Sequence, residues 1–436
     1  MMDTDERSVR EDVVCVVGLG YVGLPLAYEF DRAGYDVIGF DVDAEKIEQL
    51  RAGVDPTGDV GSDALGTCDV RFTAQEIELE RGRFVLVAVP TPVDDLENPD
   101  LKYVRAAGET IGRNLREGAT VVLESTVYPG ATREILVPAI EATSGLTGGE
   151  DFFVGYSPER IVPGDDERDL RNVVKIVSGQ DEETLEELAA LYESVVDAGV
   201  HRAPEIEVAE AAKCIENIQR DLNIALVNEL AIACDRLDVD PRAILEAAGT
   251  KWNFHEYRPG LVGGHCIPVD PFYIIYESER NGFSPKLIQQ AREVNEYMPK
   301  HVAELVLKRL NACGKVPRES TVLILGLAYK PNVGDVRTSV IDGTIAALED
   351  FDVEVVGHDP CADPDEMREE FDVEIRRRLS VSGVDGVVLA TPHDRFLEVD
   401  YARLAERMAP NPFLVDVDGA LDPTELAETE LDYTRI

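Results

Sequence analysis

One cysteine of this chain stands in a segment suited to nucleophilic chemistry. Residues 260–271 read GLVGGHCIPVDP, so Cys266 follows three glycines that let the backbone fold closely around a ligand. Asp270, which precedes a proline, suits a rigid turn that aims a carboxylate back at the thiol. A thiolate can add to an aldehyde, the thiohemiacetal can lose two electrons, and water can cleave the thioester. We therefore predict that Cys266 is a covalent nucleophile, and we expect a structural hydrogen bond from His265.

A glycine-rich turn is the second candidate site. The sequence GLGYVG, residues 18–23, follows an apolar run and precedes a helical pattern that begins PLAYEF. Its glycines permit a tight turn and close approach to a pyrophosphate, which the helix N-terminus favours electrostatically. Asp41, at the end of the next run, could accept both ribose hydroxyls of NAD and would repel the 2′-phosphate of NADP. Lys46 either reaches the adenosine side or is an exposed helix lysine. The predicted NAD contacts are Gly18, Gly20, Tyr21, Val22, Gly23, Asp41 and Lys46.

The elements that must position these residues alternate between apolar β-branched runs and helical patterns, which is typical of parallel sheets with crossover helices. The first series of runs covers residues 13–18, 36–41, 83–89, 119–125, 151–157 and 174–179, and the second covers 321–329, 353–359, 385–391 and 412–419. Between the two series, residues 207–237 predict one long helix from apolar residues three and four positions apart. We therefore predict an α/β protein with two Rossmann-like parallel-sheet domains, 1–204 and 311–436, joined by a central helical domain, 205–310. A homodimer through the long helix is expected.

The chain is strongly acidic, with 86 Asp and Glu against 42 Lys and Arg and a net charge of −44. Carboxylates dispersed along the whole chain repel nucleic acids and anionic membranes, so we expect neither as a partner. Because the carboxylates are dispersed rather than gathered into a tail, we favour a halophile-like acidic coat over the alternative of an ordinary acidic mesophilic enzyme. The polar, acidic start and the lack of a long apolar run predict a cytoplasmic protein without a signal peptide or membrane span. The other six cysteines show no CxxC spacing, so we expect buried, inert thiols, no disulfide and no metal site.

Seven motifs, in order along nearly the whole chain, resemble those of the UDP-glucose/GDP-mannose dehydrogenase family. They are VVGLGYVGLPLA, VAVPTP, ESTVYPGATR, YSPERIVPGD, AEAAKCIENIQRDLNIALVNE, RPGLVGGHCIPVDP and GLAYKPNVGDVRTS. Seven motifs in the family's order are hard to obtain by chance. The resemblance implies an enzyme that uses NAD to oxidise the primary alcohol of a UDP-sugar to a carboxylate.

The resemblance also implies catalytic roles for five residues besides the cysteine. Lys213 and Asn217, one helical turn apart, would donate hydrogen bonds to the oxyanion of the tetrahedral species. A solvated helix surface is the alternative for this pair, but Lys213 lies in a mostly apolar run of a chain with only ten lysines. Thr126 and Asp270 would hold the water that takes the alcohol proton, and Glu159 would assist proton transfers and thioester hydrolysis.

Further residues are implied as contacts of the two ligands. Thr91, in PTP, and Thr126 would touch NAD, while the C-terminal domain would bind the nucleotide of the sugar donor. Lys330 and Arg337 follow a run after which a phosphate site is expected, and Arg258 could reach a neighbouring subunit. Surface salt bridges are the alternative for these three. The implied substrate contacts are Glu159, Arg160, Lys213, Asn217, Arg258, Gly263, Lys330 and Arg337.

One position separates two branches of the family. The UDP-glucose branch has a second glutamate four positions after the SPE glutamate, where this chain has Pro163, and PER…PG resembles the branch that acts on UDP-N-acetylhexosamines. We therefore predict a four-electron oxidation at sugar C6 of a UDP-N-acetylhexosamine, consuming two NAD and one water. The alternatives are UDP-glucose as substrate, a two-electron dehydrogenase of the 6-phosphogluconate type that needs no cysteine, and a non-catalytic sugar-nucleotide sensor.

Overall fold

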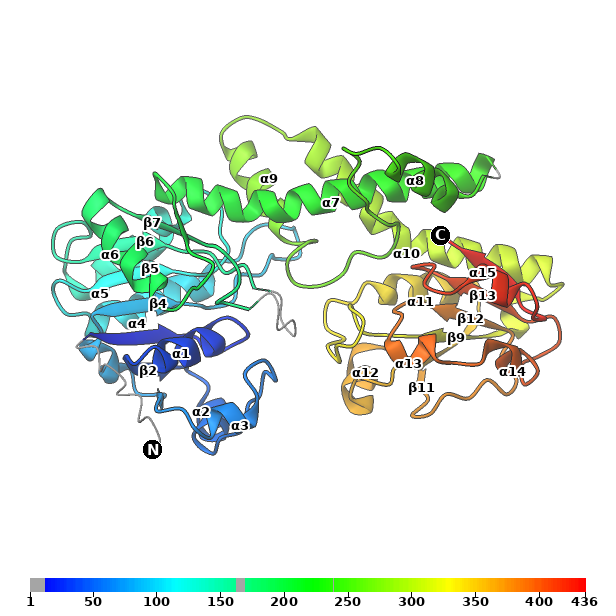
Figure 1. The fold of residues 1–436 in the computed structure, drawn as a ribbon, viewed down its shortest axis with the longest axis horizontal. Helices are drawn as coiled ribbons and strands as arrows, with labels where there is room; N and C mark the ends of the chain where they lie inside the picture. The colour runs from blue at the N-terminus through cyan, green and yellow to red at the C-terminus, as the bar shows by residue number, and fades with distance from the viewer. Residues whose placement is uncertain (1–11, 162–168, 238) are drawn as a thin grey trace, which may run out of the picture. The chain divides into compact units, whose positions relative to one another are not determined.

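The computed structural model describes residues 12–161, 169–237 and 239–436. Pro163, on which the predicted substrate preference rests, lies outside these ranges. Within them the chain forms two compact units: the first extends to Glu216 and takes in Phe272–Ser284, and the second consists of Asn217–Pro271 and Pro285–Ile436. Each unit contains one sheet with its helices (Figure 1).

The first unit has an eight-stranded sheet, as far as its described residues go, in the order β3-β2-β1-β4-β5-β6-β7-β8. The strands are β1 (Val13–Val17), β2 (Asp36–Phe40), β3 (Arg71–Thr73), β4 (Phe84–Val87), β5 (Thr120–Leu123), β6 (Phe153–Tyr156), β7 (Lys175–Gly179) and β8 (Val200–Arg202). Neighbouring strands are parallel except β6 and β7, whose antiparallel pairing the sequence did not predict. The order of the first six strands places a crevice at the carboxyl ends of β1 and β4, where α/β proteins bind nucleotides.

Helices flank this sheet, and α1 begins directly after the glycine turn as predicted. They are α1 (Gly23–Arg32), α2 (Ala44–Arg51), α3 (Ser62–Leu65), η1 (Glu76–Arg81), α4 (Lys102–Asn114), η2 (Thr132–Leu136), α5 (Val137–Ser144) and α6 (Glu182–Glu193). Residues of α1 and α6 share one apolar core with Val14 and Val16 of β1. The helices α4 and α5 pack against each other.

The second unit has a fully parallel sheet of six described strands in the order β11-β10-β9-β12-β13-β14. The strands are β9 (Thr321–Leu325), β10 (Glu354–His358), β11 (Glu374–Ile375), β12 (Gly386–Leu389), β13 (Phe413–Asp416) and β14 (Asp432–Arg435). Val322 and Ile324 of β9 face one core, and Leu323 and Leu325 face another. Burial on both faces explains why this strand is a continuous apolar run. The associated helices are η3 (Pro317–Glu319), α11 (Ile341–Glu349), α12 (Pro364–Glu370), α13 (Asp394–Leu397), α14 (Tyr401–Ala405) and α15 (Pro423–Leu426).

The predicted fold class is confirmed, and every predicted apolar run contains a strand. The sequence missed β3, β8, β11 and β14, which are the four edge strands of the two sheets. These strands are two to four residues long. An edge strand has a single neighbour and need not be apolar on both faces, so it leaves no continuous apolar run to recognise.

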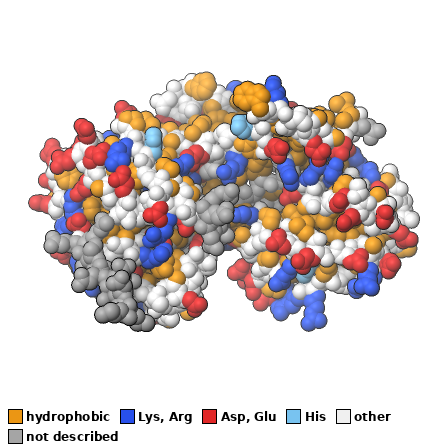
Figure 2. All heavy atoms as spheres, in the orientation of Figure 1, with side chains coloured by type: hydrophobic (Ala, Val, Ile, Leu, Met, Phe, Trp, Pro, Cys, Tyr) orange, Lys and Arg blue, Asp and Glu red, His pale blue; other side chains and the backbone are white. Residues whose placement is uncertain are grey.

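Along the chain, the segment between β8 and β9 is helical, and its described residues form no strand. The long helix is confirmed as α7 (Ile206–Leu237), and it is followed by α8 (Pro241–Gly249), α9 (Asp270–Arg280) and α10 (Lys286–Ala312). The two compact units divide these helices between them, so the three-domain boundaries stay a prediction. None of the described helices combines the length and the apolar character needed to cross a bilayer. Acidic side chains are scattered over the visible surface of both units (Figure 2).

Candidate active site

The glycine turn after β1 has the geometry of a pyrophosphate cradle. Gly18 adopts a φ of 91°, and a Cβ there would lie 2.5 Å from the carbonyl oxygen of Ala88. A Cβ at Gly23 would lie 1.8 Å from the carbonyl oxygen of Gly18, so the start of α1 packs directly on the turn. A Cβ at Gly20 would meet no atom within 4 Å. Two glycines are therefore required by packing, and the third faces open space into which a ligand phosphate fits.

Asp41 stands where a ribose-binding carboxylate is expected. It follows β2 directly and is buried; its Oδ2 accepts hydrogen bonds from Leu19 N, 2.9 Å, and Lys46 Nζ, 2.9 Å. Although burial opposes its charge, bonds from the backbone N–H groups of Asp43 and Leu19 and from Lys46 hold the pKa of Asp41 below its ordinary value. Lys46 thus lies at the predicted site rather than apart on a helix surface. The turn and the carboxylate together fit NAD.

Two neighbouring loops at the same edge of this sheet are joined by Ser125. Its Oγ accepts a hydrogen bond from Val89 N, 3.0 Å, and donates one to Val89 O, 2.6 Å. The predicted contacts Thr91 and Thr126 lie two residues and one residue from this junction. The carbonyl of Thr91 also accepts a hydrogen bond from the hydroxyl of the fully buried Tyr273. The carboxyl ends of β4 and β5 are thereby held as one surface.

Lys213 is anchored beside these loops by its neighbours on α7. Glu210 accepts hydrogen bonds from Gly130 N at 2.5 Å and from Thr132 N at 2.9 Å, and Cys214 Sγ donates to Val127 O at 3.4 Å. Lys213 itself is 9% exposed and forms no ion pair with any described residue. A shielded ammonium group without a carboxylate partner suits the predicted oxyanion role better than the alternative of a solvated helix surface.

Glu159 is held by a buried ionic network. Its Oε1 accepts hydrogen bonds from the backbone N–H groups of the next two residues at 2.6 and 2.8 Å, and its Oε2 lies 3.4 Å from Lys175 Nζ. Lys175 Nζ also lies 2.6 Å from Glu124 Oε2, and the hydroxyl of Tyr192 donates to Glu124. Although burial opposes its charge, the two carboxylates raise the pKa of Lys175. Arg160, a predicted substrate contact, is instead paired with Glu216 at 2.6 Å.

Cys266 lies in the second unit and is exposed. The two glycines before it are closely packed, because a Cβ at Gly263 would lie 3.0 Å from Thr338 O and one at Gly264 would lie 3.0 Å from the ring of Tyr329. Gly264 also has a φ of 93°. The carbonyl of Cys266 accepts a hydrogen bond from Asp270 N at 2.8 Å, which starts α9. The segment is therefore a tight turn in which Cys266 is an exposed residue.

Asn217 and Asp270 form a direct pair. Asn217 Nδ2 donates to Asp270 Oδ2 at 2.5 Å, and the two side chains belong to residues 8% and 2% exposed. The sequence placed both near the thiol but did not predict that they bind each other. The amide orients the carboxylate one helical turn away from Cys266.

The predicted nucleotide contacts of the second unit have different surroundings. Arg337 makes two hydrogen bonds of 2.9 Å to the carboxylate of Asp335, which His265 Nε2 also contacts at 3.4 Å. Although burial opposes it, these bonds hold the pKa of Asp335 far below its ordinary value. Lys330 is partly buried, and among the described residues it has no ion-pair partner. Arg258 is exposed. The expected structural hydrogen bond of His265 is thus present, and the guanidinium group of Arg337 already binds the carboxylate of Asp335.

The predicted residues divide between the two units. In the first unit lie the glycine turn, Asp41, Thr91, Thr126, Glu159 and Lys213; in the second lie Asn217, Arg258, Gly263, Cys266, Asp270, Lys330 and Arg337. Sequence reasoning missed the supporting residues Glu124, Ser125, Lys175 and Glu210. The signal available for Glu124 and Lys175 was a charge inside or directly after a buried apolar strand, where an ionised side chain needs a partner.

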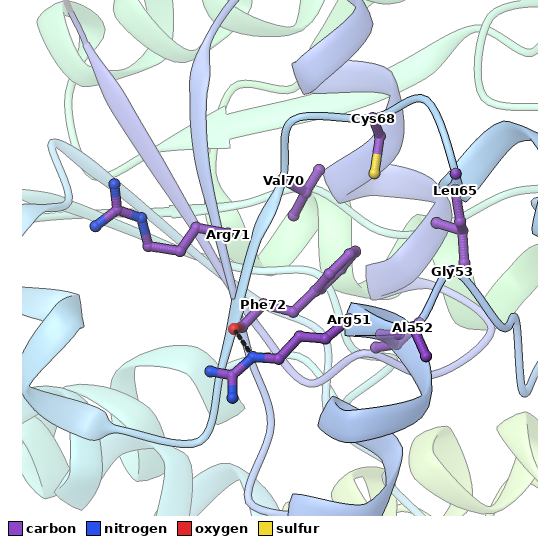
Figure 3. A pocket seen from close by; sticks show the side chains of 10 residues that line it. Arg51, Ala52, Gly53, Leu65, Cys68, Val70, Arg71 and Phe72 are labelled. Carbon is purple, nitrogen blue, oxygen red and sulfur yellow. Dashed lines mark hydrogen bonds between the residues drawn. The ribbon is translucent and has the colours of Figure 1, made fainter.

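The cavity in Figure 3, about 510 Å³, is separate from these groups. It lies between the end of α2 and β3 and is lined by residues such as Arg51, Cys68 and Phe72. Arg51 Nε donates to Phe72 O at 2.9 Å, and Figure 3 shows Arg71 extending away from the other lining side chains. None of the predicted site residues lines this cavity.

Comparison with known proteins identifies the family. Family models match residues 12–196 as the UDP-glucose/GDP-mannose dehydrogenase family NAD binding domain, 207–297 as its central domain and 323–423 as its UDP binding domain. The chain is 42% identical over 393 residues to the UDP-N-acetyl-D-glucosamine 6-dehydrogenase of Salmonella typhi, covering 90% of this chain and 92% of that protein.

Two solved structures share the whole fold. The UDP-D-ManNAc dehydrogenase of Pyrococcus horikoshii superposes with a TM-score of 0.87 and 29% identity, over 97% of this chain and 99% of that one. A UDP-glucose dehydrogenase from Pyrobaculum islandicum superposes with a TM-score of 0.85 and 29% identity, over 98% of each chain. The chain therefore belongs to the UDP-glucose/GDP-mannose dehydrogenase family and is an NAD-dependent nucleotide-sugar dehydrogenase.

Proposed function

We propose that this enzyme oxidises the C6 alcohol of a UDP-N-acetylhexosamine to the uronic acid through a thioester on Cys266. The observation that carries the proposal is the tight turn of the second unit, which places Cys266, an exposed residue, one helical turn from Asp270 and its partner Asn217. Over the whole reaction the alcohol and one water become a carboxylate, and four electrons leave in two steps. Bound NAD accepts two electrons in each step.

Each remaining role falls to a side chain of this chain. The thiolate of Cys266 adds to the aldehyde carbon, and Lys213 and Asn217 donate hydrogen bonds to the oxygen that becomes negative. After the second oxidation the carbon is a thioester, and water breaks its C–S bond and returns the thiol. Glu159 takes the proton of that water. The network behind this carboxylate supports the role because it fixes both carboxylate oxygens.

The N-acetylated substrate is favoured by two observations. The relative with 42% identity over 90% of this chain is a UDP-N-acetyl-D-glucosamine 6-dehydrogenase. Pro163 replaces the glutamate of the UDP-glucose branch. The gluco epimer is therefore the first substrate to test, followed by its manno and galacto epimers.

A panel of UDP-sugars tests the proposal. We expect NADH to form with one UDP-N-acetylhexosamine, two NADH per sugar, and a product 14 mass units heavier, because two hydrogens are replaced by one oxygen. Turnover of UDP-glucose alone would contradict the substrate, and no NAD reduction with any sugar would favour the sensor. The variant Cys266→Ser should be arrested or sluggish; full turnover would instead favour the two-electron dehydrogenase.

We propose further that two chains associate through α7. Four exposed apolar residues, Val208, Ile215, Leu226 and Leu237, are spaced by seven and eleven residues, which are whole numbers of helical turns within about 20°. An apolar stripe on one helix face is typical of a partner surface. Sedimentation should show a dimer that Leu226→Glu dissociates and that Arg220→Glu, at an exposed position on another face, leaves intact. A monomeric wild-type protein would contradict the dimer.

The reaction also suits the cytoplasm. A nucleophilic cysteine must stay reduced, and thiols stay reduced in that compartment. Fractionation of the source cells would test this assignment, which recovery with the extracellular proteins would contradict.

A further inference from the structure

A cluster of titratable side chains in the second unit has no role in the proposed chemistry. Asp359, Cys361 and His393 bring ligand atoms within 4.8 Å of one another, as a metal site would. Asp359 and His393 have fully buried side chains, and His393 Nε2 lies 2.8 Å from Asp359 Oδ2. Buried titratable groups of this kind require an explanation.

The hydrogen bonds argue against a metal. The backbone N–H of Asn332 donates to His393 Nδ1 at 2.8 Å, so that nitrogen carries a lone pair. The proton of the neutral ring is then on Nε2, which donates to Asp359 and has no lone pair to offer an ion. Besides this bond, Asp359 accepts four backbone N–H groups, from residues 327, 328, 361 and 362. Its lone pairs are filled, and the bond from His393 together with the backbone bonds holds the pKa of Asp359 below its ordinary value although burial opposes this.

The cluster occupies the position that Asp41 has in the first sheet. Asp41 and Asp359 each follow the second strand of a sheet, and each accepts the N–H of a leucine directly after the glycine that ends the first strand. Those glycines have φ angles of 91° and 87°. The first carboxylate accepts a hydrogen bond from a partly buried lysine, whereas the second is bound to a fully buried histidine. Asp41 can therefore bind a ribose in the first sheet, whereas Asp359, at the equivalent position of the second sheet, holds the neighbouring backbone in place.

The anchor fixes one short span of chain at both ends. Ala328 N donates to Asp359, and Ala328 O accepts from Thr391 Oγ1 at 2.7 Å. Four residues later, Asn332 N donates to His393, and Asn332 Oδ1 accepts from Asp394 N at 3.0 Å. Only Tyr329, Lys330 and Pro331 lie between these ends. The cluster therefore determines where these three residues lie.

This span connects the predicted nucleotide contact with the nucleophile. Lys330 is the candidate phosphate ligand, and the ring of Tyr329 packs under Gly264, two residues before Cys266. The same ring makes an edge contact with His265, with centroids 6.1 Å apart. We propose that His393 is a positioning residue that holds Lys330 against the UDP moiety and Tyr329 beneath the cysteine turn. This inference rests on the proposed function, since it assumes that Lys330 meets the UDP-sugar.

Two substitutions at His393 are each designed to remove one of the two hydrogen bonds of the imidazole ring. His393→Gln can place its amide donor near the Nε2 position for Asp359 but has no acceptor at the Nδ1 position for Asn332 N–H, whereas His393→Asn can place its amide oxygen near the Nδ1 position but has no donor at the Nε2 position. We expect Gln to raise the Kd of the full-length protein for UDP, and the KM for the UDP-sugar, about tenfold, and Asn less than about threefold. The KM for NAD should not change. A merely structural role would lower the Tm of both variants and leave their UDP affinity alike, which would overturn the proposal.

Hydrogen exchange decides the inference independently of activity and of variant folding. The amide of Asn332 should be protected in the wild-type protein and exposed in His393→Gln, and rapid exchange in the wild type would overturn the proposal. Failure of the wild-type protein to bind UDP, with this amide protected, would contradict the proposed function but retain the loop anchor. Zinc binding that is lost in His393→Gln would replace the anchor with a metal site.

Discussion

The ammonium group of Lys175 is the positive charge that pairs with both Glu159 and Glu124. The Lys175 and Glu124 side chains are 2% and 0% exposed, and their charged atoms are 2.6 Å apart. An ion pair taken out of water is stabilising only while both partners remain, because a single buried charge has no compensation. The polar residues that hold the candidate catalytic carboxylate are thus also ones on which the fold depends.

We predict that Lys175→Gln lowers the free energy of unfolding by about 3 kcal/mol, because it leaves Glu124 charged and unpaired. The double variant Glu124→Gln/Lys175→Gln should recover part of this loss, since neither charge is then buried. Urea unfolding of the wild type, both single variants and the double variant measures the coupling. A double variant that loses the sum of the two single losses would contradict the pairing.

Glu210 makes the anchoring of α7 sensitive to pH. Burial raises the pKa of Glu210 to about 7 from an ordinary value of 4.5, despite the hydrogen bonds from Thr132 and Gly130. The folded state therefore binds this proton more tightly than the unfolded state. The resulting stabilisation is complete below pH 4.5 and is lost as pH rises through about 7, a difference of about 3 kcal/mol.

The variant Glu210→Gln removes the titratable carboxyl group and so tests whether stability falls as pH rises. Between pH 4.5 and pH 8 we expect the unfolding free energy of the wild type to fall by about 3 kcal/mol relative to that of the variant. Urea unfolding of both proteins at several pH values gives the difference directly and cancels the other carboxylates. A difference that stays constant with pH would contradict the raised pKa.

At the scale of elements, the glycines of the first turn have two different roles: Gly23 is needed for packing, and Gly20 is needed for ligand binding. A Cβ at Gly23 would overlap the backbone of Gly18, whereas a Cβ at Gly20 meets no atom. We predict that Gly23→Ala lowers the free energy of unfolding by about 2 kcal/mol or more. Gly20→Ala should leave stability unchanged or slightly higher and weaken NAD binding, because the new methyl group projects toward the phosphate. Thermal unfolding and NAD titration of both variants check the pair, and equal effects on stability would contradict it.

The elements also show how far the sequence can be read. The central strands and α7 were predictable because burial on both faces, or on one long stripe, leaves a pattern in the sequence. The edge strands and the antiparallel direction of β7 were not, because strand pairing depends on neighbours distant in the chain. At the site, motif residues such as Asp41 and Cys266 were predictable, but the partners of Glu159 and Asp359 were not, since Lys175 and His393 reach them only in the folded chain.

At the scale of the whole molecule, charge is the dominant feature. A net charge of −44 on 436 residues repels itself in the compact state more than in the expanded unfolded chain. The described ion pairs include short ones such as Lys315 with Asp385 at 2.6 Å, but acids outnumber bases two to one in the whole chain, so the excess negative charge cannot be neutralised by the protein's own bases. The excess remains dispersed over the surface of both units (Figure 2).

Salt should therefore stabilise this protein over a wide range. The screening length falls from about 10 Å at 0.1 M to about 3 Å at 1 M, so repulsion between neighbouring carboxylates weakens progressively. We predict that the Tm rises steadily from 0.1 to 2 M KCl, and most steeply at the low end, where screening changes most. Sucrose at matched osmolality controls for exclusion of solutes from the protein surface, which stabilises without screening charge. Repeating the series at pH 4.5, where the carboxylates begin to protonate, should flatten the KCl dependence and leave that of sucrose unchanged. A Tm independent of KCl at neutral pH would show that the acidic surface is not self-repelling, and an ordinary acidic enzyme would then be the better description.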